Sequence, residues 1–213
     1  MADRAGVDRK SSTSGSRTRV YLIRHGQVEG HEERRYNGQD DVGLTPLGWE
    51  QYRVLQQRLR DRPLAAIFSS DLSRCLDGAR LLGRAHGLDP VPLPALRELN
   101  IGQWQGVTWQ ELQRRFPEQW AARLGDIVHY RVPGGESLLD LSRRVLPAMQ
   151  AALAAHAGAE MVVVAHGAVN RVILLDALDA PLRSAFRLEQ SYGCLNIIDY
   201  YEGGRCTVQL LNG

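Results

Sequence analysis

Hydrophobic positions along the chain fall into short continuous runs separated by longer amphipathic segments. The apolar runs lie at residues 18–24, 65–70, 161–165, 194–201 and 206–211. Short apolar runs bounded by turn residues are typical of strands, and a run without any polar residue is typical of a strand buried on both faces of a sheet. We therefore expect these runs to be strands, with residues 161–165 at the centre of the sheet.

Apolar residues at helical spacing occupy the segments between these runs. Thr45 followed by Pro46 indicates a helix start, because threonine caps a first turn and proline suits its first position. Ser137 and Asp140 have the spacing of a capping box at the start of another helix. We expect helices over residues 46–62, 73–86, 137–156 and 167–178, and one or two more within 104–132.

Strands that alternate with helices predict an α/β fold, here a three-layer α/β/α sandwich with helices on both faces of a mostly parallel sheet. Residues 1–17 are polar and contain the low-complexity run SSTSGS, which predicts a disordered tail. Residues 18–213 are expected to form a single domain, since compact domains usually contain about 100–200 residues.

Composition narrows the class of protein. The 213 residues carry a formal net charge of only +2 and the arginines are spread along the chain, so we do not expect a nucleic-acid partner. The sequence contains neither an apolar stretch long enough to span a membrane nor the apolar segment of a secretory signal. Three widely spaced cysteines indicate neither a disulfide framework nor a zinc site. We therefore expect a cytoplasmic protein with no membrane partner. The sequence does not determine the oligomeric state, and a homodimer is one of the possibilities.

Polar residues follow three of the predicted strands at the point where each strand ends. In chain order they are Arg24-His25-Gly26, Ser69-Ser70-Asp71 and His166-Gly167. Ligands of α/β sheets bind beyond the carboxyl ends of the strands. We therefore expect these three segments to converge on one pocket.

The residue types at this pocket favour an anionic ligand. Arg24 stands beside His25, and Arg74 lies in the first turn of a helix, where free backbone N–H groups attract anions. His166 repeats the histidine–glycine pattern at a second strand end, and Glu98 supplies an acid–base group from a loop between apolar residues.

These motifs belong to a longer ordered set that extends from about Val20 to Arg171. With this set the chain resembles the histidine phosphatase superfamily, in its phosphoglycerate-mutase-like branch. The matching segments are Arg24-His25-Gly26; Arg35-Tyr36-Asn37-Gly38 with Asp41 and Leu44-Thr45-Pro46-Leu47-Gly48; Ser69-Ser70-Asp71-Leu72-Ser73-Arg74; Leu96-Arg97-Glu98 with Gly102-Gln103-Trp104-Gln105-Gly106; Pro133-Gly134-Gly135-Glu136-Ser137; and Val164-Ala165-His166-Gly167.

The resemblance implies a role for each of the five pocket residues. His25 would attack phosphorus and become a phosphohistidine, which imidazole can do near neutral pH because its free pKa is about 6.5. Arg24, Arg74 and His166 would hold the phosphoryl oxygens as three cationic groups. Glu98 would protonate the leaving oxygen and then activate water. With the charge balanced by side chains, neither a metal nor another cofactor is required.

Three further residues are candidate substrate contacts. Tyr36 and Asn37 lie in the loop after the nucleophile and could line the pocket, although Asn37 before a glycine equally suits a plain turn. In many relatives an asparagine six residues after the nucleophile reaches the substrate phosphate. Here that position is His31, so the sequence departs from the family pattern at this contact.

Three functions of different classes follow. The motifs look most like α-ribazole phosphatases and broad-specificity sugar phosphatases, which predicts a phosphomonoester hydrolase acting on a small phosphorylated metabolite. The alternative is a cofactor-dependent phosphoglycerate mutase, but such mutases usually follow the catalytic glutamate with an Arg-His-Tyr-Gly run and a longer basic insertion. Here residues 99–102 are Leu-Asn-Ile-Gly, which favours the hydrolase. A non-catalytic phosphate-binding module would lack the nucleophile or the acid, and this chain has both.

Overall fold

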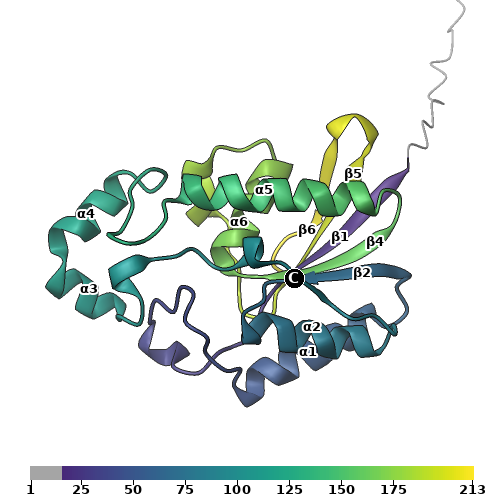
Figure 1. Ribbon diagram of the computed structural model, residues 1–213, viewed down its shortest axis with the longest axis horizontal. Helices are drawn as coiled ribbons and strands as arrows, with labels where there is room; N and C mark the ends of the chain where they lie inside the picture. The colour runs from purple at the N-terminus through teal and green to yellow at the C-terminus, as the bar shows by residue number, and fades with distance from the viewer. Residues whose placement is uncertain (1–15) are drawn as a thin grey trace, which may run out of the picture.

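The computed structural model describes residues 16–213, which form a six-stranded sheet with helices on both faces (Figure 1). The strand order is β3-β2-β4-β1-β5-β6. Strands β1 to β4 run parallel, whereas β5 pairs antiparallel with β1, and β6 pairs antiparallel with β5. From β1 to β6 the strands span Arg17–Arg24, Leu64–Ser69, Val91–Pro92, Glu160–Ala165, Leu195–Tyr201 and Cys206–Leu210.

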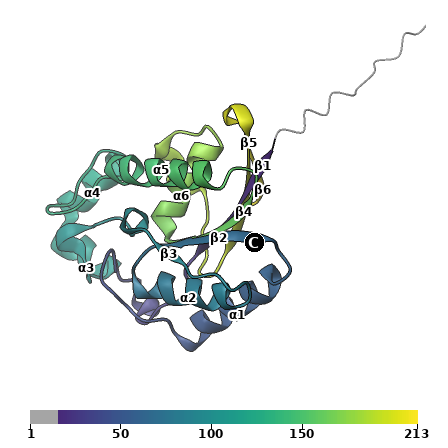
Figure 2. The ribbon, with the colours of Figure 1, turned by 45° about the vertical axis from the view of Figure 1, so that its right-hand side comes forward.

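The helices form two layers and a separate pair. Helices α5 and α6 cover one face of the sheet and α1 and α2 the other, as both ribbon views show (Figures 1 and 2). Helices α3 and α4 lie beyond one end of the sheet, at the left of Figure 1. From α1 to α6 the helices span Pro46–Leu59, Ser73–Arg84, Trp109–Arg115, Pro117–Gly125, Leu138–Ala155 and Gly167–Ala177.

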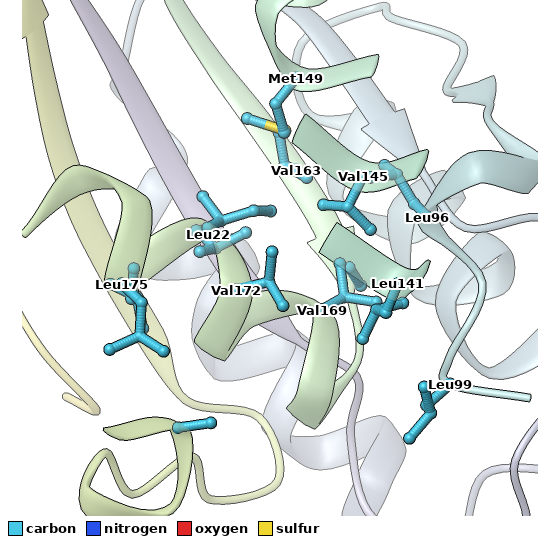
Figure 3. Close-up of a cluster of buried hydrophobic side chains, with 14 of the residues drawn as sticks. Leu22, Leu96, Leu99, Leu141, Val145, Met149, Val163, Val169, Val172 and Leu175 are labelled. Carbon is cyan, nitrogen blue, oxygen red and sulfur yellow. The ribbon is translucent and has the colours of Figure 1, made fainter. Parts of the chain in front are cut away.

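The two cores follow from the alternation of side chains along the central strands. In β4, Val163 belongs to the core under α5 and α6, whereas its neighbours Val162 and Val164 belong to the core over α1 and α2, because successive strand residues point to opposite faces. Figure 3 shows the first of these cores between β1, β4, α5 and α6. Its labelled residues are Leu22, Leu96, Leu99, Leu141, Val145, Met149, Val163, Val169, Val172 and Leu175.

Two of the predicted helix starts are present in atomic detail. The Thr45 hydroxyl accepts a hydrogen bond of 3.0 Å from the backbone N–H of Gly48 and so caps α1. At α5 the Ser137 hydroxyl accepts from the backbone N–H of Asp140 at 3.1 Å, and the Asp140 carboxylate accepts from the Ser137 N–H at 2.9 Å. These reciprocal bonds satisfy N–H groups that the first helical turn leaves free.

The predicted fold class is confirmed, and the differences are local. The proline-rich segment after α2, which is not among the predicted strands, contributes the two-residue edge strand β3. Strand β1 begins at Arg17, one residue earlier than expected, and is preceded by the exposed Ser16. Residues 1–15 of the predicted tail lie outside the described residues. None of the helices in residues 16–213 is both long enough and apolar enough to pass through a bilayer.

Candidate active site

The functional side chains gather where three neighbouring parallel strands end. In the sheet β4 lies between β1 and β2, with Arg24 paired to Ala165 and Ser69 paired to Val164. The next residue along each strand, which is His25, His166 or Ser70, therefore lies at the same edge. The predicted convergence of these strand ends is present in the structure.

His25 and His166 face each other across this edge. Their ring centroids are 5.1 Å apart at an interplanar angle of 64°. The His25 side chain is buried, and its Nδ1 lies 2.8 Å from the carbonyl oxygen of Gly26. Because a carbonyl oxygen can only accept, Nδ1 carries the proton and Nε2 keeps a free lone pair. This tautomer leaves Nε2 available as a nucleophile.

The surroundings of His25 keep its imidazole neutral. Burial lowers the pKa of His25 well below 6.5, and the positive charges of Arg24 and Arg74 lower it further. The hydrogen bond to the Gly26 carbonyl acts in the opposite direction and is the smaller effect. The ring is therefore unprotonated at neutral pH, which a histidine nucleophile requires.

Burial and neighbouring positive charges also act on the ring of His166. It is fully buried at the start of α6, and burial together with Arg74, His25 and Arg24 lowers its pKa well below 6.5. The ring is therefore neutral in the free protein, and its role as a cation toward a bound phosphoryl group stays a prediction. Its Nε2 lies 2.8 Å from the hydroxyl of Ser70, so the end of β2 orients the ring at the end of β4.

Cys75 is the neighbour of His166 on the α2 side. Its Sγ lies 3.5 Å from His166 Nε2 and 3.4 Å from the carbonyl oxygen of Ala165. Burial raises the pKa of the Cys75 thiol, so it remains protonated and is a poor nucleophile. The fully buried Cys75 side chain packs beside the histidines as a small apolar group.

Arg24 reaches the site from the last position of β1. Its Nη1 donates to the carbonyl of Gln190, and its guanidinium lies 4.0 Å from the centroid of the Tyr192 ring. The same tyrosine ring is 5.5 Å from the ring of His25. Among the described residues, Arg24 Nε is buried without a hydrogen-bond partner, which leaves one guanidinium N–H for a ligand.

Arg74 reaches the site from the first turn of α2 and is 98% buried, with a relative exposure of 2%. Its Nη1 donates to the carbonyl of Asp40 at 2.6 Å, and its Nη2 donates to the carbonyl of Gly38 at 2.7 Å. The backbone carbonyl of Arg74 accepts from the hydroxyl of Tyr52 at 2.9 Å. Arg74 therefore links the loop after β1 to the histidines, which also experience its charge.

The carboxylate of Glu98, which lies in a loop, contacts the first turn of α6. Its Oε1 accepts from the backbone N–H of Leu99 at 2.8 Å, and its Oε2 accepts from the N–H of Ala168 at 3.3 Å. Ala168 follows His166 by two residues, so the carboxylate lies at the edge that carries both histidines. Glu98 is half-buried.

The other predicted contacts are not joined to this centre by any hydrogen bond among the described residues. Tyr36 stacks on the ring of Trp109, 5.8 Å away at an angle of 19°, within an aromatic cluster between the loop and α3. His31 lies in a short 3-10 helix, and Asn37 forms a turn in which its carbonyl accepts from Asp40. The turn interpretation of Asn37 is thus supported, and substrate contacts of all three residues stay predictions.

Tyr192 and Ser70 were not among the predicted site residues. Ser70 could have been found, because it ends one of the three strands that the sequence places at the pocket. Tyr192 carries no such signal, since it lies in a short turn before β5. Among residues 16–213, no three histidine, cysteine, aspartate or glutamate side chains form a group that could hold a metal ion.

Comparison with known proteins finds relatives that match most of the chain. The family model of the histidine phosphatase superfamily (branch 1) matches residues 20–213. A bifunctional protein of Mycobacterium tuberculosis is 37% identical over 93% of this chain, and the chain spans 54% of the length of that protein. A probable phosphoglycerate mutase, GpmB, of Yersinia pestis is 35% identical over 86% of this chain and 85% of its own length.

Solved structures with the same fold include phosphatases. The α-ribazole phosphatase of Shigella flexneri superposes with a TM-score of 0.84 at 26% identity, over 92% of this chain and 96% of that one. A mycobacterial glucosyl-3-phosphoglycerate phosphatase superposes with a TM-score of 0.84 at 27% identity, over 92% of this chain and 99% of that one.

Proposed function

The chain belongs to branch 1 of the histidine phosphatase superfamily, and from this membership we propose that it hydrolyses the phosphate monoester of a small metabolite through a phosphohistidine. The main support is the state of His25, a buried and neutral imidazole with Nε2 free and with two arginines beside it. A neutral ring is a nucleophile, and the arginines attract the phosphate that it attacks.

The first half of the reaction transfers the phosphoryl group to the protein. The lone pair of His25 Nε2 forms the N–P bond while the bond between phosphorus and the ester oxygen breaks. Glu98 gives its proton to the departing oxygen, so the leaving group departs as an alcohol. The Nδ1–H of His25 keeps its hydrogen bond to the Gly26 carbonyl, which stabilises the positive charge that the ring gains.

The second half releases phosphate. Glu98, now ionised, takes a proton from water as the water oxygen attacks phosphorus, and the N–P bond breaks with its electrons returning to His25 Nε2. The products are the alcohol and inorganic phosphate, and both residues return to their starting states. One carboxyl group thus serves as acid and then as base.

Arg24 and Arg74 supply the permanent positive charge for the phosphoryl oxygens. The N-termini of α2 and α6 open onto the same edge and favour an anion there. We propose that His166 serves as a hydrogen-bond donor to the phosphoryl group and that its pKa rises when the anion arrives, because an opposite charge favours the protonated ring. Electrostatic stabilisation of this kind accounts for most phosphoryl-transfer catalysis.

Phosphoglycerate mutation is the second candidate, because GpmB is named a probable phosphoglycerate mutase. Two observations favour hydrolysis instead. Both solved phosphatases named above share the fold over nearly their whole length, and no basic run follows Glu98, where the chain reads Leu-Asn-Ile-Gly.

We expect the protein to release phosphate from phosphate monoesters and to interconvert phosphoglycerates poorly. Incubation with 3-phosphoglycerate and a catalytic amount of 2,3-bisphosphoglycerate should give little 2-phosphoglycerate, while a panel of sugar, glycerol and aryl phosphates should contain at least one ester that yields inorganic phosphate. Both products are measured in the same samples. Efficient interconversion without phosphate release would replace the hydrolase by the mutase.

We also expect turnover without a metal. Side chains supply every charge-balancing group in the proposed mechanism. EDTA should therefore leave the rate of p-nitrophenyl phosphate hydrolysis unchanged within about twofold, far less than the loss that follows removal of a catalytic group. The control is a metal-dependent alkaline phosphatase treated in parallel. Loss of activity in EDTA that Mg²⁺ or Zn²⁺ restores would contradict the mechanism.

A further inference from the structure

The loop that carries Glu98 has little regular structure to hold it. A 3-10 turn at Pro94–Leu96 precedes it, and the 3-10 turn at Gly102–Trp104 follows. The buried side chains of Leu96 and Leu99 anchor the loop in the core beside α5, on either side of Glu98 in sequence (Figure 3). These two leucines attach the loop to the core, but they cannot donate hydrogen bonds to the backbone carbonyls of the loop.

Arg144 of α5 supplies those donors. Its Nη1 donates at 2.8 Å to the carbonyls of Ala95 and Arg97, and its Nη2 donates at 2.9 Å to the carbonyl of Glu98 itself. One guanidinium group therefore binds the backbone carbonyl of Glu98 and two carbonyls just before it in the chain. A lysine could not reproduce this arrangement, because an ammonium has three donors and no planar fork.

Glu136 holds the other side of this guanidinium. Its two carboxylate oxygens accept from Arg144 Nε at 2.8 Å and from Nη2 at 2.9 Å. Glu136 Oε2 also accepts from the backbone N–H of Asn100 at 3.0 Å. The ion pair therefore fixes the loop on both sides of Glu98, and every nitrogen of the Arg144 guanidinium donates to protein.

We propose that Arg144 is a positioning residue of the reaction, which holds the peptide of Glu98 so that the carboxyl group meets the leaving oxygen at the edge where His25 and His166 lie. Because its nitrogens are engaged by protein, Arg144 acts through Glu98 and not on the substrate. The inference rests on the acid–base role proposed above for Glu98. Gln39, whose Nε2 donates to the Glu98 carbonyl at 3.0 Å, supports the same peptide from the loop after β1.

The test compares two esters and two neighbouring arginines. R144M keeps an unbranched apolar side chain, shorter than that of arginine, and loses all the hydrogen-bond donors. R143M changes the preceding residue, whose side chain is 69% exposed and lies 3.9 Å from the carboxylate of Asp140. kcat/KM is measured for an alkyl phosphate and for p-nitrophenyl phosphate, since only the alkyl leaving group needs a proton strongly. The same measurements are made on E98Q and on the double variant E98Q/R144M.

We expect R144M to lose on the order of 10²-fold in kcat/KM for the alkyl ester, as a displaced catalytic group does, and much less for p-nitrophenyl phosphate. The double variant should lose no more than E98Q alone, because two residues that act as a unit are not additive. R143M should match the wild type. Equal losses for both esters, or full additivity with E98Q, would overturn the proposal.

Circular dichroism and thermal unfolding show whether R144M folds. If it does not fold, the same comparison is made with R144K. A smaller loss confined to the alkyl ester supports the positioning role, and a uniform loss contradicts it. The two proposals fail in different ways. If E98Q itself does not distinguish the esters, the role of Glu98 is wrong; if E98Q distinguishes them and the folded Arg144 variants do not, only the inference about Arg144 is wrong.

Discussion

Replacing His25 with alanine is expected to lower phosphate-ester turnover by roughly 10⁴–10⁶-fold, the scale on which an enzyme loses activity with its nucleophile. The physical reason is that no other group near the transferred phosphoryl is poised to attack it. His166 is neutral too, but its Nε2 is engaged with the Ser70 hydroxyl, and Cys75 is held as a thiol. Of the two histidines at this edge of the sheet, His25 is the one whose Nε2 has no hydrogen-bond partner among residues 16–213.

The covalent intermediate provides the second measurement on this variant. Rapid quenching of the wild-type reaction with a ³²P-labelled ester should trap label that is labile in acid and stable in base, as expected of a P–N bond, and H25A should trap none. H129A is the matched control, because the His129 side chain is 66% exposed and pairs only with Asp126. Acid-stable label, or undiminished labelling of H25A, would point to a different nucleophile.

Replacing Glu98 with glutamine should give the second-largest effect, and the size of the loss should depend on the leaving group. An alkoxide is strongly basic and departs only when protonated, whereas p-nitrophenolate is a weak base that departs with little help. A general acid typically contributes about 10²–10⁴-fold, so E98Q should lose that much in kcat/KM for an alkyl phosphate and far less for p-nitrophenyl phosphate.

The choice of kinetic constant matters for this variant. Glu98 also activates water in the second half of the proposed reaction, so kcat can fall for both esters through slow hydrolysis of the phosphohistidine. kcat/KM reports only the steps through the first irreversible one. E118Q is the control, since Glu118 is exposed on α4. Equal losses in kcat/KM for the two esters would remove Glu98 from the acid role, and Asp71 or Glu136 would be the next candidates.

Asp71 and Glu136 are both engaged elsewhere in the structure, which is consistent with the choice of Glu98. The Asp71 carboxylate receives two hydrogen bonds from Arg97, at 2.7 and 2.6 Å, and this pairing lowers its pKa. The Glu136 carboxylate is paired with Arg144. Because its pKa is lowered, the Asp71 carboxyl group is a poor proton donor, and the hydrogen bonds of Glu136 direct its carboxylate toward Arg144.

Much of this architecture is determined by short segments of sequence. Thr45 and Pro46 start α1, and Ser137 and Asp140 start α5, because a cap and the N–H that it satisfies lie within one turn of each other. The strand ends that carry His25 and His166 were equally predictable. Parallel strands place their carboxyl ends at one edge, so a polar residue after each apolar run is brought to the same place.

The hydrophobic pattern of the sequence was less informative about the burial of single side chains and about very short strands. Leu47 belongs to the apolar residues of α1, yet it is 51% exposed, whereas Tyr52, Leu55 and Leu59 are buried. The two residues of β3 could not be distinguished by pattern from a connection. Their strand character comes from pairing with Phe68 and Ser69 of β2.

Only the tertiary structure decided the chemical state and the support of the site. The neutrality of His166 results from complete burial beside two arginines, and burial depends on every element that excludes water from that point. Arg24 is bound by Gln190, 166 residues away, and Glu98 by Arg144, 46 residues away. The residues before and after Tyr192 give no sign that its ring will lie against Arg24 and His25. A sequence motif shows which side chains are present. Their protonation states and orientations depend on contacts between segments that only the completed fold brings together.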